Sequence, residues 1–216
     1  MAVKRDYSSQ LRAEQARKTR RVIVAAAARL FVEDGYGITT IDAVAEAAGV
    51  SRKTIFTAVG GKCQLLTTAL EWALVGDDEP VPLAERPAVR EIGRRTDPAA
   101  IIAGYVAVIV EIDSRVAELS QALVVAAGVD PEARAARDKR IGQRLAGARA
   151  FVKHLANHDG LRADLDAASA ADIVWLHSDP VLYHRLVIER HWPQKRFTTW
   201  LQRTLTVQLC PPPQEP

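Results

Sequence analysis

Two cationic side chains and a hydroxyl stand together in the first third of the chain: Arg52, Lys53 and Thr54. They directly follow the glycine-containing turn GVS at residues 49–51. Arg and Lys can donate hydrogen bonds to O6 and N7 of guanine, and Thr can contact a thymine methyl group or a phosphate. Such side chains at the start of a short helix, after a tight glycine turn, are typical of a helix presented to the DNA major groove. The spacing therefore predicts a helix-turn-helix.

Apolar spacing and capping residues predict the helices that position these side chains. Between about residues 15 and 34, apolar residues repeat at i, i+4 and i+8, and Gly35 is expected to end that helix. The T-x-x-D pattern at residues 39–42 predicts the start of a second helix, because a Thr oxygen can accept a free amide there. Ser51 is expected to cap the third helix, and a fourth is expected over residues 62–75 after two glycines.

The remainder of the chain predicts further helices and no strands. Residues 76–87 are rich in proline and acid and predict a connection. Two Asp-Pro pairs, at residues 97–98 and 130–131, predict capped helix starts. The expected helices lie near residues 84–95, 97–112, 114–127, 131–158, 168–178, 180–190 and 193–208. We therefore expect an all-α fold with a helix-turn-helix domain at residues 1–62, folded from residue 16, and a helical bundle at residues 63–216.

Composition and charge narrow the classes of protein. Hydrophobic residues make up 48% of the 216 residues and alanine is abundant, which favours a helical globular chain. No apolar run approaches the roughly 18 residues that a membrane-spanning helix needs, and the N-terminus lacks the apolar centre of a signal peptide. Two cysteines, Cys63 and Cys210, do not predict a disulfide framework. We expect a cytoplasmic protein.

The positive charge is concentrated at the N-terminal end. Residues 1–66 hold eleven Lys and Arg against six Asp and Glu, whereas the whole chain has a net charge of only +3. This asymmetry fits a nucleic-acid-binding module joined to a body that does not bind DNA, or a helix whose charges are merely solvated. Residues 1–14, with Lys4, Arg5 and Arg12, are expected to form a loose arm that contacts DNA or is simply disordered.

Residues 18–66 resemble a known family. The segments AARLFVEDGY and TTIDAVAEAAGVSRKTIFTAVGGK, followed by LL, closely resemble the TetR family of bacterial transcriptional regulators. The Gly-Tyr, Thr-Thr, Ala-Gly-Val-Ser and Gly-Lys landmarks occur in a single register. Near the C-terminus, DPVLYHRLVIERHWPQKRFTTWLQRTL is similar to the closing helix pair of members that dimerise there.

The resemblance implies a set of DNA-contacting residues. Arg52, Lys53 and Thr54 would face base edges, whereas Thr39 and Thr40 would meet a phosphate. Lys62 matches the phosphate-binding lysine of the family, and Arg20 and Arg21 would add further phosphate contacts. The full expected set is Arg20, Arg21, Thr39, Thr40, Ser51, Arg52, Lys53, Thr54, Phe56 and Lys62.

Two positions depart from the family pattern. The usual Tyr of the recognition helix is Phe56 here, so the hydroxyl that reaches phosphate is missing and we expect packing or an apolar contact instead. The usual His-Phe pair is Ala58-Val59, which leaves a smaller core anchor. Neither change alters the expected fold.

The expected effector pocket and dimer surface lie in the C-terminal bundle. The pocket residues are aromatic or apolar with one polar partner: Tyr105, Ile109, Phe151, Trp175 and His177. The type and spacing of each of them suit an ordinary core better than a ligand contact. The dimer surface is expected to use the helix at 131–158 and the final helices, with Ile141, Leu145, Val152, Leu155 and Leu186.

Other chemistry has little support in the sequence. Cys63 stands beside Lys62 at a helix start, where a thiolate sensor would be stabilised. His154 and His158 share a helix face and could chelate a metal, but no carboxylate lies between them, so no metal site and no cofactor is predicted. No nucleophile elbow, Walker loop or dinucleotide fingerprint is present. We expect no enzyme.

Together these features predict a homodimeric regulator, a repressor, that binds a palindromic DNA operator and is released by a small hydrophobic or amphipathic effector. Two alternatives stay open. One is a constitutive, architectural DNA-binding dimer without an effector. The other is a helical small-molecule-binding or enzymatic protein whose helix-turn-helix no longer binds DNA.

Overall fold

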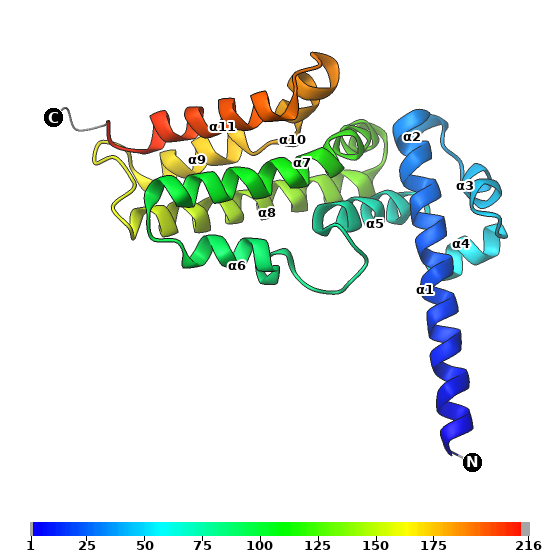
Figure 1. Ribbon diagram of the computed structural model, residues 1–216. Coiled ribbons are helices and arrows are strands. Elements are labelled where there is room, and N and C mark those ends of the chain that lie inside the picture. Colours follow the sequence, from blue (N-terminus) through cyan, green and yellow to red (C-terminus); the bar gives the residue numbers. More distant parts are fainter. Residues whose placement is uncertain (1, 213–216) are drawn as a thin grey trace. The chain divides into compact units, whose positions relative to one another are not determined.

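Helices account for all the regular structure in the part of the chain that is described. The computed structural model describes the backbone of residues 2–212 and the side chains of residues 11–212. The predicted all-α fold is confirmed (Figure 1). The elements are α1 (Ala2–Glu33), α2 (Gly35–Ile38), α3 (Ile41–Ala48), α4 (Arg52–Ala58), α5 (Lys62–Val75), η1 (Leu83–Glu85), α6 (Pro87–Arg94), α7 (Pro98–Val129), α8 (Pro131–Ala156), α9 (Ala167–His177), α10 (Pro180–Tyr183), η2 (His184–Glu189) and α11 (Gln194–Leu209).

The contacts divide the chain into two compact units. The first contains residues 1–73 and 118–136, and the second contains residues 74–117 and 137–216. Helices α7 and α8 are therefore each shared, with one end in each unit. The expected functional boundary after Lys62 stays a prediction. Within the described residues, no helix combines the length and apolarity needed to cross a membrane.

In the first unit, the apolar face of α1 packs against α3 and α4. Ile23, Ala27 and Phe31 are buried, as the spacing of the apolar residues predicts. The chain leaves α1 through Gly35, whose φ of +79° lies in the left-handed region that favours glycine. The expected loose arm at residues 1–14 is wrong in its backbone, because α1 begins at Ala2. The side chains of Lys4 and Arg5 lie outside the described residues.

Helix α7 is a single helix where two were expected. Ser114 was expected to begin a new helix, but its hydroxyl donates backwards to the carbonyl of Glu111 (2.7 Å). A serine bonded in this way sits inside a helix rather than at its N-cap. The apolar stripe also continues, with Val116, Leu119 and Leu123 buried. The separate helices predicted at 97–112 and 114–127 are therefore one element, capped at its start by Asp97, which accepts from the Ala100 amide (2.7 Å).

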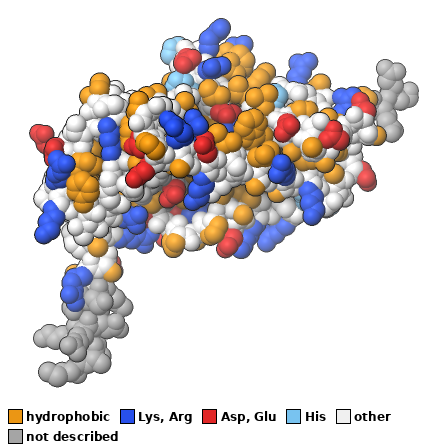
Figure 2. Space-filling view, turned by 180° about the vertical axis from the view of Figure 1, so that it is seen from behind, with side chains coloured by type: hydrophobic (Ala, Val, Ile, Leu, Met, Phe, Trp, Pro, Cys, Tyr) orange, Lys and Arg blue, Asp and Glu red, His pale blue; other side chains and the backbone are white. Residues whose placement is uncertain are grey.

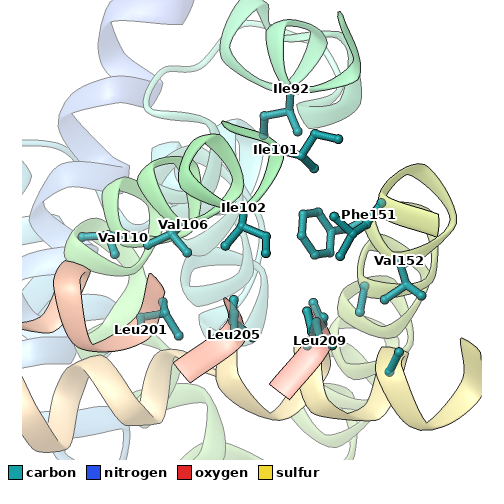
Figure 3. Close-up of a cluster of buried hydrophobic side chains, with 14 of the residues drawn as sticks. Ile92, Ile101, Ile102, Val106, Val110, Phe151, Val152, Leu201, Leu205 and Leu209 are labelled. Carbon is teal, nitrogen blue, oxygen red and sulfur yellow. The ribbon is translucent and has the colours of Figure 1, made fainter. Parts of the chain in front are cut away.

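The core of the second unit lies between α7, α8, α9 and α11. On α11, Phe197, Leu201, Leu205 and Leu209 recur every four residues and are all buried. Figure 3 shows these leucines facing branched residues of α7 and the Phe151 and Val152 side chains of α8. Burial of each such side chain stabilises the fold by roughly 1.5–3 kcal/mol. This core fixes the face that each helix turns inwards.

Candidate functional site

The turn between α3 and α4 is fixed by its first and last residues. Gly49 has φ +65°, and its amide donates to the carbonyls of Ala45 and Glu46. Ser51 caps α4, as predicted, by accepting from the amide of Thr54 (3.1 Å). The Thr54 hydroxyl lies 2.8 Å from the Ser51 hydroxyl. The start of α4 is thus held in one conformation, with little conformational freedom left to lose on binding.

The two threonines before α3 have different roles from those expected. Thr40, not Thr39, is the N-cap of α3, accepting from the amide of Ala43 (3.0 Å). Thr39 is only 1% exposed, and its hydroxyl donates to the carbonyls of Leu30 and Gly35. The prediction that Thr39 caps the helix and contacts phosphate is therefore wrong. Its side chain instead joins the end of α1 to the start of α3, while Thr40 remains exposed.

The outer face of α4 carries the predicted base-reading side chains. Arg52 and Lys53 are exposed, and Thr54 is partly buried. The Arg52 guanidinium lies 2.9 Å from the Asp42 carboxylate, and both side chains are more than half exposed. An exposed ion pair of this kind contributes about 0–1 kcal/mol, so a guanine or phosphate can replace it. Phe56 is 50% exposed, which suits an apolar contact better than core packing.

Lys62 belongs to a polar network rather than to open solvent. Its ammonium lies 4.4 Å from the centre of the Tyr36 ring and 3.3 Å from the carbonyl oxygen of Gly37. Burial lowers the pKa of Lys62, and the charge of Asp130 partly opposes this change. The ammonium keeps only part of its hydrogen-bonding capacity for a phosphate. Whether it contacts DNA stays a prediction.

Asp130 is the centre of that network. Its Oδ2 accepts from the buried Tyr36 hydroxyl (2.5 Å), and its Oδ1 caps α8 by accepting from the amides of Glu132 and Ala133. The hydrogen bond from Tyr36 holds the pKa of Asp130 below its ordinary value, while burial raises the pKa of Tyr36. Next to it, Gln64 donates to Glu132 (2.9 Å). The α7–α8 turn is thereby bonded to α2 and α5 within the first unit.

The two arginines predicted on α1 are both exposed. The Arg20 guanidinium carbon lies 5.7 Å from the centre of the Trp72 ring. Arg21 lies one residue further along the same helix. On the face drawn in Figure 2, Lys and Arg are interspersed with Asp and Glu rather than forming a uniform positive patch. A phosphate-binding role for either arginine stays a prediction.

Cys63, considered as a thiolate sensor, and His154, considered as a metal ligand, both have structural surroundings. Cys63 is buried, and burial raises the pKa of its thiol, the reverse of what a thiolate sensor needs. His154 Nε2 lies 3.1 Å from the carbonyl oxygen of Ile92 and 3.0 Å from that of Arg95. This ring joins α8 to the C-terminal end of α6.

The predicted pocket residues lie together, except for the polar partner. Tyr105 stacks on Phe151 with ring centres 4.0 Å apart, and Ile109 and Trp175 pack against the same core. His177 instead accompanies α11: its Nε2 is 3.4 Å from Gln208 Nε2. That these residues bind an effector stays a prediction.

The sequence did not predict the polar residues that accompany these pocket residues. Asp113 lies eight residues after Tyr105 on α7 and is 2% exposed. The Arg144 guanidinium lies over the Trp175 ring, 5.2 Å from its centre. A detectable signal was present, because Asp113 continues the i, i+4, i+8 stripe of Tyr105 and Ile109 in an otherwise apolar stretch. Arg144 gave no such signal, since α8 is rich in arginine throughout.

The predicted dimer stripe on α8 is partly wrong. Val152 and Leu155 are buried in the core of their own protomer, where Figure 3 shows Val152 beside Phe151 and Leu209. The same apolar stripe that suggested an interface is the one that α8 turns inwards. Leu145 and Leu186 are partly buried, and Ile141 is exposed. Apolar side chains with a larger exposed fraction than Ile141 occur on α9 and α11, at Leu176 (56%) and Val207 (66%).

Comparison with known proteins identifies the fold. The family model described as "Bacterial regulatory proteins, tetR family" matches residues 23–68, which span the end of α1 through the start of α5. No curated protein sequence matches the chain.

Similar solved structures cover most of the chain. One is the SmeT–triclosan complex, with 17% identity, a TM-score of 0.69, and coverage of 91% of this chain and 93% of that one. Another is a protein from Saccharomonospora viridis, described as a transcriptional regulator and solved with choline, with 18% identity, a TM-score of 0.68, and coverage of 90% and 99%. A third is TylP, a tetR regulator from Streptomyces fradiae, with 21% identity, a TM-score of 0.55, and coverage of 91% and 89%.

At these identities the solved structures establish the fold, and the family model supplies the sequence match over the helix-turn-helix. The buried Thr39, the left-handed Gly49 and the Ser51 cap all lie inside the matched residues. Residues 23–68 therefore match the tetR family of bacterial regulatory proteins, and the chain has the fold of solved tetR-family regulators.

Proposed function

We propose that the chain is a cytoplasmic transcriptional repressor that binds a palindromic operator as a homodimer and has no enzymatic activity. The observation that carries this proposal is the exposed start of α4. Arg52 and Lys53 are exposed there, on a helix whose position is fixed by the left-handed Gly49 and the Ser51 cap. In a two-fold dimer, two such helices enter successive major grooves about 34–36 Å apart.

A small hydrophobic or amphipathic effector releases the protein from DNA in this proposal. Two of the similar solved proteins hold small molecules, triclosan and choline, which supports a ligand for this chain as well. An effector acts only if it binds one conformation more tightly than the other. Helices α7 and α8 provide a continuous route, because each has one end in each compact unit and Asp130 joins their turn to Tyr36.

For the dimer we propose a surface on α9 and α11 rather than the inward stripe of α8. Leu176 and Val207 are large apolar side chains that are more than half exposed. Figure 2 shows hydrophobic side chains gathered in patches on the face that it draws. Exposed apolar patches are typical of protein–protein interfaces. Ile141 and Leu186 remain candidates at its edge.

Replacing Arg52 with alanine tests the proposal directly. The operator is first selected from genomic fragments by the purified protein, and its affinity is then measured by fluorescence anisotropy. Arg52→Ala should weaken operator binding by roughly 1–3 kcal/mol and relax sequence preference, because a base-reading donor is lost. The matched control is Arg94→Ala on α6, which removes an equally charged, exposed side chain of the second unit. Equal losses in both variants, or no selected palindrome, would refute the proposal.

Lys62→Ala separates phosphate contact from base reading. We expect it to weaken binding to all sequences similarly. It should also reduce the salt dependence of the affinity, because the variant neutralises one phosphate fewer and so releases fewer counterions from the DNA. If Lys62→Ala instead weakened binding to some DNA sequences more than to others, the ammonium would influence base reading by α4. Circular dichroism checks that the Lys62–Tyr36 contact is not needed for folding.

A further inference from the structure

Three buried polar atoms without hydrogen bonds lie in one cluster of the second unit. Among the described side chains, Asp113 Oδ2, Arg144 Nε and Trp175 Nε1 are the buried nitrogen and oxygen atoms that have no partner. Arg144 lies over the Trp175 ring, and its charge acts on Asp113. Since buried polar atoms are almost always paired in folded proteins, three unpaired atoms on neighbouring side chains mark a site.

The charge of Arg144 is already balanced, whereas that of Asp113 is not. Arg144 donates to the Asp179 carboxylate (2.6 Å) and to the carbonyl of Trp175 (2.7 Å). Asp113 is the only Asp, Glu, Lys or Arg among the described side chains that is fully buried. A second carboxylate, Asp179, acts on it together with the single guanidinium. Burial raises the pKa of Asp113 well above the ordinary value, and the charge of Arg144 only partly opposes this change.

Aromatic side chains lie on the same helices as the residues of this cluster. Tyr105, Ile109 and Asp113 share one face of α7, and Tyr105 stacks on Phe151 of α8. Trp175 supplies a further ring, on the side of α9. Aromatic faces attract cations through the negative charge density above the ring. The cluster therefore combines an apolar, aromatic part with a single uncompensated acid.

We propose that Asp113, together with the rings of Tyr105, Phe151 and Trp175, binds an organic ammonium ion with an apolar body. The ammonium donates to Asp113 Oδ2 and supplies its missing counter-ion, while the apolar body lies against the rings. An anionic ligand is disfavoured, because it would add a third negative charge beside Asp113 and Asp179 against one guanidinium. The inference rests on the proposed function, since it names the chemical class of the effector.

Two features of the structure favour access to this cluster. The Arg144 and Asp179 side chains are 24% and 32% exposed, so their ion pair connects the buried carboxyl group to solvent. Asp179 also caps α10, and the π-helix η2 (His184–Glu189) follows that element directly. Short π-helical turns occur often at functional sites, where the backbone rearranges easily. A ligand enters by displacing the Arg144–Asp179 pair.

Isothermal titration calorimetry with three matched probes tests this proposal on the full-length protein. The probes are phenethylamine, which is cationic at neutral pH, the neutral 3-phenylpropan-1-ol and the anionic 3-phenylpropanoate. We expect phenethylamine to bind at least tenfold more tightly than the other two. Asp113→Asn keeps the shape of the side chain and should weaken phenethylamine at least tenfold, whereas Asp172→Asn, which alters an exposed acid on α9, should leave it unchanged.

Equal binding of the three probes, or unchanged amine binding by Asp113→Asn, would overturn the proposal. Absence of amine binding would also overturn it, but Arg52-dependent operator binding would then still stand, so the two failures are distinguishable. A measurement on the wild type covers the case in which Asp113→Asn does not fold. The ¹³C resonance of the Asp113 carboxyl group should move towards its ionised position on addition of phenethylamine, and an unmoved resonance would contradict the assignment.

Discussion

Two aspartates of one helical stretch, one in the middle of α7 and one directly after its last residue, have opposite surroundings. Asp130 follows the last residue of α7, accepts three hydrogen bonds and has a lowered pKa. Asp113, seventeen residues earlier on α7, is buried with an unpaired oxygen and has a raised pKa. The first carboxylate stabilises the folded chain because its partners are all present. The second is costly, because a buried carboxyl group with an unpaired oxygen loses its hydration without a full set of hydrogen bonds in return.

The two aspartates also predict opposite responses to pH. A lowered folded-state pKa means that the stabilisation by Asp130 is present above the ordinary value near 3.8 and is lost as the pH falls below it. A raised folded-state pKa means the reverse for Asp113: the unfolded carboxyl group ionises first, so the folded state loses relative stability as the pH rises above that value. The comparison can therefore be tested by variants and by pH together.

The largest expected effect comes from Asp130→Ala. This change removes the cap of α8 and leaves the buried Tyr36 hydroxyl without an acceptor. A lost cap costs about 1 kcal/mol and an unpaired buried hydroxyl about 1–3 kcal/mol, so the free energy of unfolding should fall by roughly 2–4 kcal/mol. Urea denaturation followed by circular dichroism measures it.

Asp138→Ala is the control for that experiment. Asp138 lies in α8 as well, but it is exposed and pairs only with the adjacent Arg137. Its replacement should change stability by no more than about 0.5 kcal/mol. If the two variants lost similar amounts of unfolding free energy, Asp130 would contribute no more to stability than an ordinary surface carboxylate.

Asp113→Asn should change the free energy of unfolding in the opposite direction to Asp130→Ala. At pH 7 we expect it to raise the free energy of unfolding, because burial penalises the ionised carboxylate and a neutral amide avoids that penalty. The gain should shrink as the pH falls towards the ordinary value near 3.8 and should vanish below it, where Asp113 is protonated in both states. The groups that act on Asp113 are Arg144 and Asp179, and these are unchanged in the variant. Thermal unfolding of both proteins from pH 4 to pH 8 gives the difference; a gain independent of pH would contradict the raised pKa.

The smallest effect belongs to Tyr36→Phe. The ring remains stacked on Phe31 and under the Lys62 ammonium, and only the hydroxyl is lost. Asp130 keeps its two amide donors, so the cost should be about 1 kcal/mol. If coupling passes through this bond, the variant should also bind the operator with a weaker response to the effector. A loss as large as that of Asp130→Ala would mean that the ring packing, not the hydrogen bond, holds the turn.

The sequence predicted the helix-turn-helix well because its signals are local. Gly49 is required by a left-handed turn, Ser51 caps the helix that follows it, and the stripe of α1 repeats with the helical period. Even there, the choice between Thr39 and Thr40 depended on tertiary structure. Both can cap a helix, and only the carbonyls of Leu30 and Gly35 determine that Thr39 is buried.

The second unit was predicted less well because its signals are not local. An inward stripe and an interface stripe look alike in sequence, so Val152 and Leu155 were assigned to a dimer surface although they are core. Ser114 resembled a helix start, and only its bond to Glu111 shows otherwise. Asp113 and Arg144 lie thirty-one residues apart in the sequence. The charge of Arg144 acts on Asp113 only after α7 and α8 have packed together.

The proposed function depends above all on base reading by Arg52 at the exposed start of α4. The most direct measurement is a double-mutant cycle between Arg52→Ala and single base-pair substitutions across one half of the selected operator, with affinities measured at fixed salt. We expect one or two adjacent positions at which the effects of the protein and DNA changes are coupled by roughly 1–3 kcal/mol. Coupling near zero at every position would contradict it.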